Sequence, residues 1–239
     1  MNKSDIKGII FDYGGTIDTN SMHWAEVLWD KYEEYKVPVT KEEFREAYVH
    51  GERTLAVNPL VKPEHNFHDV LSIKTKIQMD YLAEKGNLNC STEELNRYAK
   101  NVADSCYNYV LDVLKITRKV VEELSHKYKL VLVSNFYGNI NTILEDFDLA
   151  RFFSDVIESS VVGVRKPDPA IYALGVQAMG YVAENVLVVG DSFSKDVVPA
   201  KKVGCKVAWL EGKGWGGEEI DRTLPDVIIT DLAQLPAML

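Results

Sequence analysis

Residues 6–16 read IKGIIFDYGGT, and this stretch decides how the rest of the chain is interpreted. Residues 6–11 form a short, mostly apolar run rich in isoleucine, which is typical of a buried strand. The run ends at Asp12, and after Tyr13 two glycines allow the backbone to turn sharply and to approach a ligand closely. The stretch therefore predicts an aspartate held at the end of a buried strand.

Apolar runs of strand length recur further along the chain, at residues 130–133, 155–157, 186–189, 207–210 and 227–229. Segments with apolar residues at helical spacing separate these runs and predict helices. One of these helices is expected to begin with Asp168 as N-cap and Pro169 as its first residue. Strands that alternate with helices predict right-handed βαβ units and a mostly parallel sheet flanked by helices, which is an α/β fold. The first strand belongs to this sheet, because parallel strands this apolar need both faces covered.

The segment between about residues 20 and 110 has a different character, with many Glu, Lys, Tyr and Trp residues and little strand signal. Apolar residues recur at helical spacing over residues 24–32, and residues 40–43 and 91–94 have the form of helix capping boxes. This pattern predicts a helical insertion. The expected domains are an α/β core formed by residues 1–18 and 111–239 and an all-helical domain formed by residues 19–110.

Composition narrows the class of protein. The 239 residues are 46% hydrophobic and 26% charged, which is ordinary for a folded globular chain. With 36 acidic and 27 basic residues the net charge is −9, which disfavours nucleic acid as a partner. The three cysteines, Cys90, Cys106 and Cys205, have no metal-ligand spacing and are expected to be buried, reduced thiols.

Residues 1–8 lack the apolar stretch of a signal peptide, and no run approaches the ~18 apolar residues of a membrane span. We therefore expect a cytoplasmic enzyme without a membrane partner, and the sequence leaves its oligomeric state open.

In parallel sheets, working residues lie just beyond the carboxyl ends of the strands. Asp12 could attack phosphorus there, as carboxylate nucleophiles do, or could simply cap a turn. Asp191 follows a later strand and Asp196 lies one helical turn on. Near Asp12 they would supply oxygen ligands for Mg²⁺, and otherwise they would be ordinary acids at a helix N-terminus.

Lys166, Ser134 and Asn135 each allow two interpretations. The proline that follows Lys166 favours extended backbone, so this lysine could direct its ammonium at a phosphate or at the nucleophile, or could be a surface charge. Ser134 and Asn135 could donate hydrogen bonds to phosphate oxygens or could cap a turn. Residues 212–217 read GKGWGG but lack the order of a phosphate-binding loop, so a surface loop is expected.

Taken in order, four motifs resemble the haloacid dehalogenase (HAD) superfamily, in its phosphatase-like branch: residues 12–16, 134–135, 166–169 and 190–196. The resemblance covers nearly the whole chain. It implies a Rossmann-like core with a helical C1 cap that closes over the active site. It also implies a Mg²⁺-dependent hydrolase of small phosphorylated metabolites.

The same resemblance implies a role for each matching residue. Asp12 would be the nucleophile that forms an aspartyl phosphate, and Lys166 would neutralise charge. Ser134 would hold the phosphoryl group, in a phosphate-binding set that also contains Gly15, Asn135 and Lys166. The expected metal ligands are Asp12, the backbone carbonyl of Gly14, Asp191 and Asp196, the last either as a ligand or as an acid behind the ligands.

Position 14 departs from the phosphatase pattern. Phosphatases of this superfamily carry there an aspartate that protonates the leaving group, and this chain has Gly14. Glycine keeps the carbonyl ligand but removes the proton donor, which should slow hydrolysis about 10²–10⁴-fold without preventing phosphate binding. We hypothesise that His23 reaches the site as a substitute; alternatively it is a hinge or surface histidine.

Three functions stay open at this point. The chain could be a weak or leaving-group-selective phosphatase, a phosphate-binding regulatory or interaction protein, or a hydrolase of carbon–phosphorus or carbon–halogen bonds. Cleavage of a carbon–phosphorus bond would need a lysine from the helical domain, and the sequence does not single one out. The candidates are Lys31, Lys36, Lys41, Lys62, Lys74, Lys76, Lys85 and Lys100. Trp24, Trp29, Tyr32 and Tyr48 could line a pocket or belong to the core.

Overall fold

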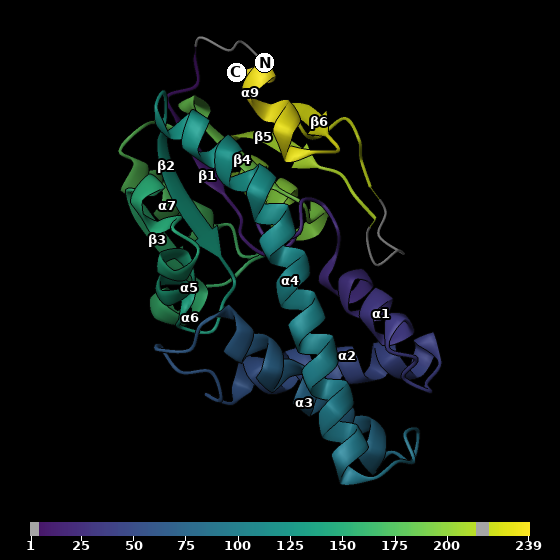
Figure 1. The fold of residues 1–239 in the computed structure, drawn as a ribbon. Coiled ribbons are helices and arrows are strands. Elements are labelled where there is room, and N and C mark those ends of the chain that lie inside the picture. The colour runs from purple at the N-terminus through teal and green to yellow at the C-terminus, as the bar shows by residue number, and fades with distance from the viewer. Residues whose placement is uncertain (1–4, 214–219) are drawn as a thin grey trace.

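The computed structural model describes residues 5–213 and 220–239, and within them the strands form a six-stranded, fully parallel sheet in the order β3-β2-β1-β4-β5-β6 (Figure 1). The strands are β1 (Gly8–Phe11), β2 (Lys129–Ser134), β3 (Asp155–Glu158), β4 (Val186–Gly190), β5 (Lys206–Leu210) and β6 (Val227–Ile229). Each lies where an apolar run predicted it, so the parallel α/β fold is confirmed. Residues 214–217 of the predicted surface loop lie outside the described residues.

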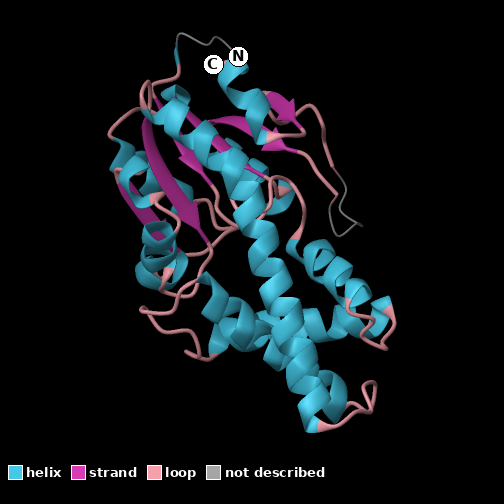
Figure 2. Cartoon of the chain, viewed as in Figure 1, coloured by secondary structure: helices cyan, strands magenta, loops and turns pink. Residues whose placement is uncertain are grey.

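Helices connect the strands and cover both faces of the sheet (Figure 2). The α-helices of the described residues, including those of the insertion, are α1 (Trp24–Glu34), α2 (Lys41–Val57), α3 (Phe67–Glu84), α4 (Thr92–Ser125), α5 (Ile140–Asp146), α6 (Ser159–Val162), α7 (Ala170–Met179), α8 (Val198–Val203) and α9 (Leu235–Met238).

Successive residues of each central strand pack into two different cores. Ile9 and Phe11 of β1 belong to the core that contains side chains of α4, whereas Ile10 belongs to the core that contains side chains of α7 and α8. Residues of β2 and β4 alternate in the same way. Both faces are thus apolar, which explains why the strands read as continuous hydrophobic runs.

The insertion between β1 and β2 contains α1 to α4, and α4 extends from these helices up along the sheet (Figure 1). Both predicted capping boxes are present, Thr40 with Glu43 at the start of α2 and Ser91 with Glu94 at the start of α4. With 34 residues, α4 is about 51 Å long and runs through the predicted domain boundary at residue 110 without a break. The division into core and cap stays a prediction.

Helix α7 begins one residue later than the sequence predicts. Pro169 occupies the N-cap position, because its carbonyl accepts the first helical hydrogen bond, from the Ala173 N–H at 3.1 Å. Asp168 nevertheless caps the helix, since its Oδ1 accepts a 2.9 Å hydrogen bond from the Ala170 N–H. The prediction of Asp168 as N-cap is therefore corrected by one position.

Two further expectations concern whole-chain properties. In the described ranges, 5–213 and 220–239, no helix combines the length and the apolar character needed to cross a membrane. All three cysteines are free thiols, and Cys106 and Cys205 are buried as expected. The expectation of burial is wrong for Cys90, which is partly exposed.

Candidate active site

The strand order brings Asp12 and Asp191 to the same edge of the sheet. β1 lies between β2 and β4, so the chain turns to opposite sides of β1, and the crevice at such a switch point is where ligands bind in open α/β sheets. Phe11 pairs with Val189 in the register, and the Asp12 N–H donates to the Val189 carbonyl at 2.9 Å. Asp12 therefore follows β1 next to the point where Asp191 follows β4.

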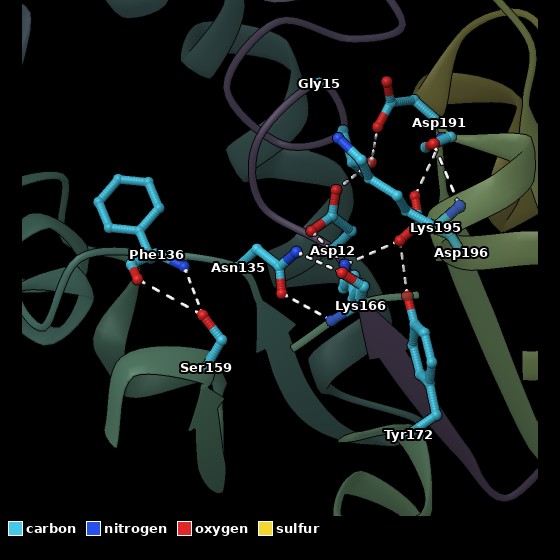
Figure 3. Close-up of polar contacts among 12 residues, drawn as sticks. Asp12, Gly15, Asn135, Phe136, Ser159, Lys166, Tyr172, Asp191, Lys195 and Asp196 are labelled. Carbon is cyan, nitrogen blue, oxygen red and sulfur yellow. Dashed lines mark hydrogen bonds and ion pairs between the residues drawn. The ribbon is translucent and has the colours of Figure 1, made fainter. Parts of the chain in front are cut away.

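Lys166 joins two acids beneath this edge (Figure 3). Its Nζ lies 2.6 Å from Oδ1 of Asp12 and 2.8 Å from Oδ1 of Asp196. The hydroxyl of Tyr172, on α7, donates to the same Asp196 oxygen at 2.6 Å. Only 4% of Lys166 is exposed, so its charge is balanced by these two carboxylates rather than by water.

The loop after β1 is shaped around the carboxyl group of Asp191. The Thr16 hydroxyl lies 3.5 Å from Oδ2 of Asp12 and 3.4 Å from Oδ1 of Asp191. Gly15 has φ +91°, and a Cβ on it would lie 2.4 Å from the Asp191 carboxyl group. Only glycine satisfies both conditions, because that φ disfavours L side chains and the space is already filled.

Burial and mutual repulsion disturb the titration of the strand-end acids. Burial and the neighbouring Asp196 carboxylate raise the pKa of Asp12 to about 6, against the opposing effect of Lys166. Burial, Asp196 and Asp12 hold the pKa of Asp191 well above its usual range. Although burial opposes it, the pair of Asp12 and Asp196 raises the pKa of Lys166. The site thus concentrates negative charge that a bound cation would relieve.

The donor set fits a small hard cation. One ligand atom each from Asp12, Asp191 and Asp196 can be chosen so that all three lie within 4.8 Å of one another. Mg²⁺ prefers such carboxylate oxygens and is usually held by one or two of them together with substrate phosphate. Asp196 already receives Lys166 and Tyr172 on Oδ1 and the Ser192 N–H on Oδ2, at 2.9 Å. Both carboxylate oxygens of Asp196 are thus already engaged, which favours the second of its two predicted roles, that of an acid behind the metal ligands.

Asn135 and Ser134 occupy different positions relative to Lys166. The Asn135 side chain donates to the Lys166 carbonyl at 3.0 Å and accepts from the Lys166 N–H at 2.9 Å. It therefore holds the lysine backbone in place, a contact that the sequence did not reveal. Ser134 ends β2 with 1% of its surface exposed and faces the same cavity as Asp12.

His23 is the N-cap of α1. Its Nδ1 accepts a 3.1 Å hydrogen bond from the Ala25 N–H, so a neutral ring carries its proton on Nε2. Burial, together with Lys195, lowers the pKa of His23. The ring is accordingly neutral at physiological pH, which suits a base better than an acid.

A cavity of about 1000 Å³ separates the strand ends from helices α1 to α3. It collects every site residue that the sequence singled out: Asp12, Gly14, Gly15, His23, Ser134, Asn135, Lys166, Asp191 and Asp196. Its other walls include Asp18, Glu52 and Lys74, and Lys74 is one of the eight lysines of the insertion that the sequence offered as candidates. Nothing lies within 4 Å of a Cβ built on Gly14, so the position of the missing acid is open space.

These features define an α/β enzyme with an acidic, lysine-neutralised site at the switch point of a parallel sheet. A family model for haloacid dehalogenase-like hydrolases matches residues 6–204, and the chain belongs to that family of hydrolases. The resemblance inferred from the four motifs is thereby confirmed.

Known proteins resemble this chain over its full length. It is 30% identical over 249 residues to a phosphoglycolate phosphatase of Shigella dysenteriae, with 100% of this chain and 95% of that protein covered. The HAD-hydrolase YfnB of Bacillus subtilis, solved with magnesium, has a TM-score of 0.60 at 18% identity and 98% coverage of both chains. The L-2-haloacid dehalogenase of Xanthobacter autotrophicus has a TM-score of 0.59 at 20% identity, again with 98% of both covered. Both structural likenesses concern the fold.

Proposed function

We propose that this chain is a Mg²⁺-dependent hydrolase of small phosphorylated metabolites that works through an aspartyl phosphate on Asp12. The observation that carries the proposal is the buried contact of 2.6 Å between Asp12 and Lys166 in a cavity that also holds Asp191. The name of the phosphoglycolate phosphatase relative supports phosphate chemistry over carbon–halogen cleavage.

In the proposed reaction, an oxygen of Asp12 attacks phosphorus, the bond from phosphorus to the leaving oxygen breaks, and that oxygen takes up a proton. Water then attacks the phosphorus and the bond to Asp12 breaks, which releases phosphate and the free carboxylate. Lys166 favours the ionised form of Asp12 that attack requires. Ser134 and the backbone near Gly15 would hold phosphoryl oxygens.

Asp12, Asp191 and the Gly14 carbonyl would hold Mg²⁺, with Asp196 behind them as the partner of Lys166. When bound, the ion neutralises and orients phosphoryl oxygens. We further propose that residues 19–110 act as a cap that excludes water from the cavity.

Without a carboxyl group at position 14, proton transfer to the leaving group is the weak step. We propose that the enzyme favours substrates whose leaving group needs little protonation. A neutral His23 could take a proton from the attacking water in the second step but is poorly suited to donate one in the first.

The test measures phosphate release with Mg²⁺ across phosphorylated metabolites and activated phosphates, for wild type, Asp12→Asn and Gly14→Asp. We expect turnover to vanish in Asp12→Asn and to rise in Gly14→Asp, because the open space at Gly14 accepts a side chain. Full turnover in Asp12→Asn would refute the assignment of Asp12 as the nucleophile. A silent wild type that Gly14→Asp activates would favour the second candidate, a phosphate-binding protein, which Gly14 itself motivates.

A further inference from the structure

Lys74 stands apart from the other lysines of the helical insertion. Of the eight that the sequence offers there, all within the described residues, it is the one that lines the cavity shared with Asp12. It lies on α3, and 8% of its surface is exposed. A lysine buried to this degree needs a partner, because burying an unpaired charge is costly.

Lys74 is held in a cage of side chains from α1, α2 and the loop after β2. Its Nζ lies 2.7 Å from Oε1 of Glu52, on α2. The same Nζ lies 5.9 Å from the ring centres of Trp24 and of Tyr137, within the range of cation–π attraction. The Tyr137 hydroxyl donates to Oε2 of Glu52 at 3.2 Å. The ammonium is therefore fixed in position before any substrate binds.

These contacts keep Lys74 charged. Burial alone would lower its pKa, but Glu52, Tyr137 and Tyr48 outweigh burial and raise the pKa of Lys74. In cleavage of a carbon–phosphorus bond, the lysine would form a Schiff base with the substrate, and this reaction needs the neutral amine. The surroundings of Lys74 thus favour electrostatic binding over covalent chemistry.

Charge on the cavity wall points in the same direction. Apart from Asp12, Lys166, Asp191 and Asp196, the charged residues of the lining are four cations, Arg53, Lys74, Arg165 and Lys195, and two acids, Asp18 and Glu52. Burial raises the pKa of Asp18 to about 7, so its charge is only partly present at neutral pH. Taken together, these remaining lining charges are net positive and complement an anion.

We propose that Lys74 is a specificity-determining residue that binds an anionic group, a carboxylate or a second phosphate, on the part of the substrate that leaves. Glu52 is the counter-ion that positions it. This inference rests on the proposed phosphatase function and narrows its substrates to phosphate esters with an anionic leaving group.

The test compares kcat/KM for three phosphate esters of similar size with different charges on the leaving group: 2-phosphoglycolate, ethyl phosphate and phosphoethanolamine. Wild type should prefer them in that order. Lys74→Met should lower kcat/KM for 2-phosphoglycolate about 10- to 100-fold and leave ethyl phosphate nearly unchanged, because a charged hydrogen bond is lost only with the first. Lys74→Arg should retain the preference. Comparison of kcat/KM for 1,2-ethanediol bisphosphate with kcat/KM for 2-phosphoglycolate shows whether Lys74 prefers a second phosphate or a carboxylate.

Two controls separate binding from folding. Lys76→Met changes an exposed lysine on the same helix, paired with Asp80 outside the cavity, and should leave all rates unchanged. The double variant with Lys74→Met and Glu52→Gln removes the ion pair without an unpaired acid and should lose the same preference. Equal losses on all three esters, or a wild-type preference for phosphoethanolamine, would overturn the proposal.

Failure of the proposed function is distinguishable from failure of this inference. If the wild-type protein hydrolyses none of the esters, calorimetry of the same compounds with wild type and Lys74→Met decides the role of Lys74 alone. Weaker binding of 2-phosphoglycolate to the variant would support an anion site. Equal binding to both proteins would exclude it.

Discussion

The Nζ atom of Lys166 lies 2.6 Å from Oδ1 of Asp12, although 154 positions separate the two residues in the chain. The same atom lies 2.8 Å from Asp196, and all three side chains are buried. A single cation therefore stabilises two buried carboxylates that would otherwise repel each other. Charge balance at the candidate active site depends on this contact more than on any surface ion pair.

Replacing Lys166 by Gln should lower kcat/KM for phosphate esters about 10²–10³-fold, since a positioned charge at the reacting group is lost. Steady-state kinetics on purified variants measures the effect. Lys201→Gln removes a lysine whose partner is Asp226, outside the cavity lining, and should leave kcat/KM unchanged. Wild-type kinetics in Lys166→Gln would contradict the role assigned to this lysine.

Replacement of Gly14 and of Gly15 by alanine should have different effects on the free energy of unfolding. Gly15→Ala places a Cβ 2.4 Å from the Asp191 carboxyl group at φ +91°. We expect it to lower the free energy of unfolding by about 1–3 kcal/mol and to weaken Mg²⁺ binding. Gly14→Ala adds a Cβ in open space and should leave stability nearly unchanged. Urea unfolding of the two variants tests this, and equal stabilities would contradict the packing described.

Stability should fall as the pH rises through the titration range of Asp18. This carboxyl group accepts the Gly15 N–H at 2.7 Å and the Trp24 indole N–H at 2.8 Å, yet burial raises its pKa from 3.8 to about 7. Between these values the folded state binds more protons than the unfolded state, so the free energy of unfolding decreases with pH, by about 4 kcal/mol at most.

The measurement is urea unfolding of wild type and Asp18→Asn between pH 4 and pH 8 in the presence of a chelator. As the pH rises, the free energy of unfolding of wild type should decrease relative to that of Asp18→Asn. A difference that stays constant over this range would show that Asp18 does not titrate there.

Mg²⁺ should raise the melting temperature, because it binds the folded arrangement of Asp12 and Asp191 and relieves their repulsion. At a concentration about 100 times the dissociation constant, the stabilisation would be about 2.7 kcal/mol. Thermal unfolding with and without MgCl₂ measures it. Asp191→Asn should lose most of the shift, whereas Asp80→Asn, at a surface pair with Lys76, should keep it. An equal shift in both variants would place the ion elsewhere.

Several features of the site could be predicted because they depend on local pattern and on a general rule of topology. Apolar runs marked all six strands, and parallel strands direct their carboxyl ends to one edge. These two facts together predict that Asp12 and Asp191 lie at the same edge of the sheet. The roles of Lys166 and Asp196 are implied by the resemblance of their motifs to the HAD superfamily, because the residues alone also allow a surface charge and an ordinary helix acid.

Other features depend on side chains that meet only when the chain folds. Tyr172 and Asn135 hold Asp196 and Lys166 through contacts between elements distant in sequence. The burial of Asp18, which raises the pKa of its carboxyl group, arises only in the folded chain. Helix α4 crosses the expected domain boundary because its apolar face continues from the helical insertion onto the sheet.

The sequence by itself determined the parallel α/β fold, the helical insertion and the acidic residues at the strand ends, because apolar runs and hydrophobic period follow from local composition. The order of the strands in the sheet was decided by the tertiary structure. Only the tertiary structure decided which of eight similar lysines lines the cavity shared with Asp12. Each of those lysines has the same chemistry in an extended chain. Packing of α3 against α2 and α4 buries Lys74 beside Glu52, whereas Lys76 on the same helix is exposed.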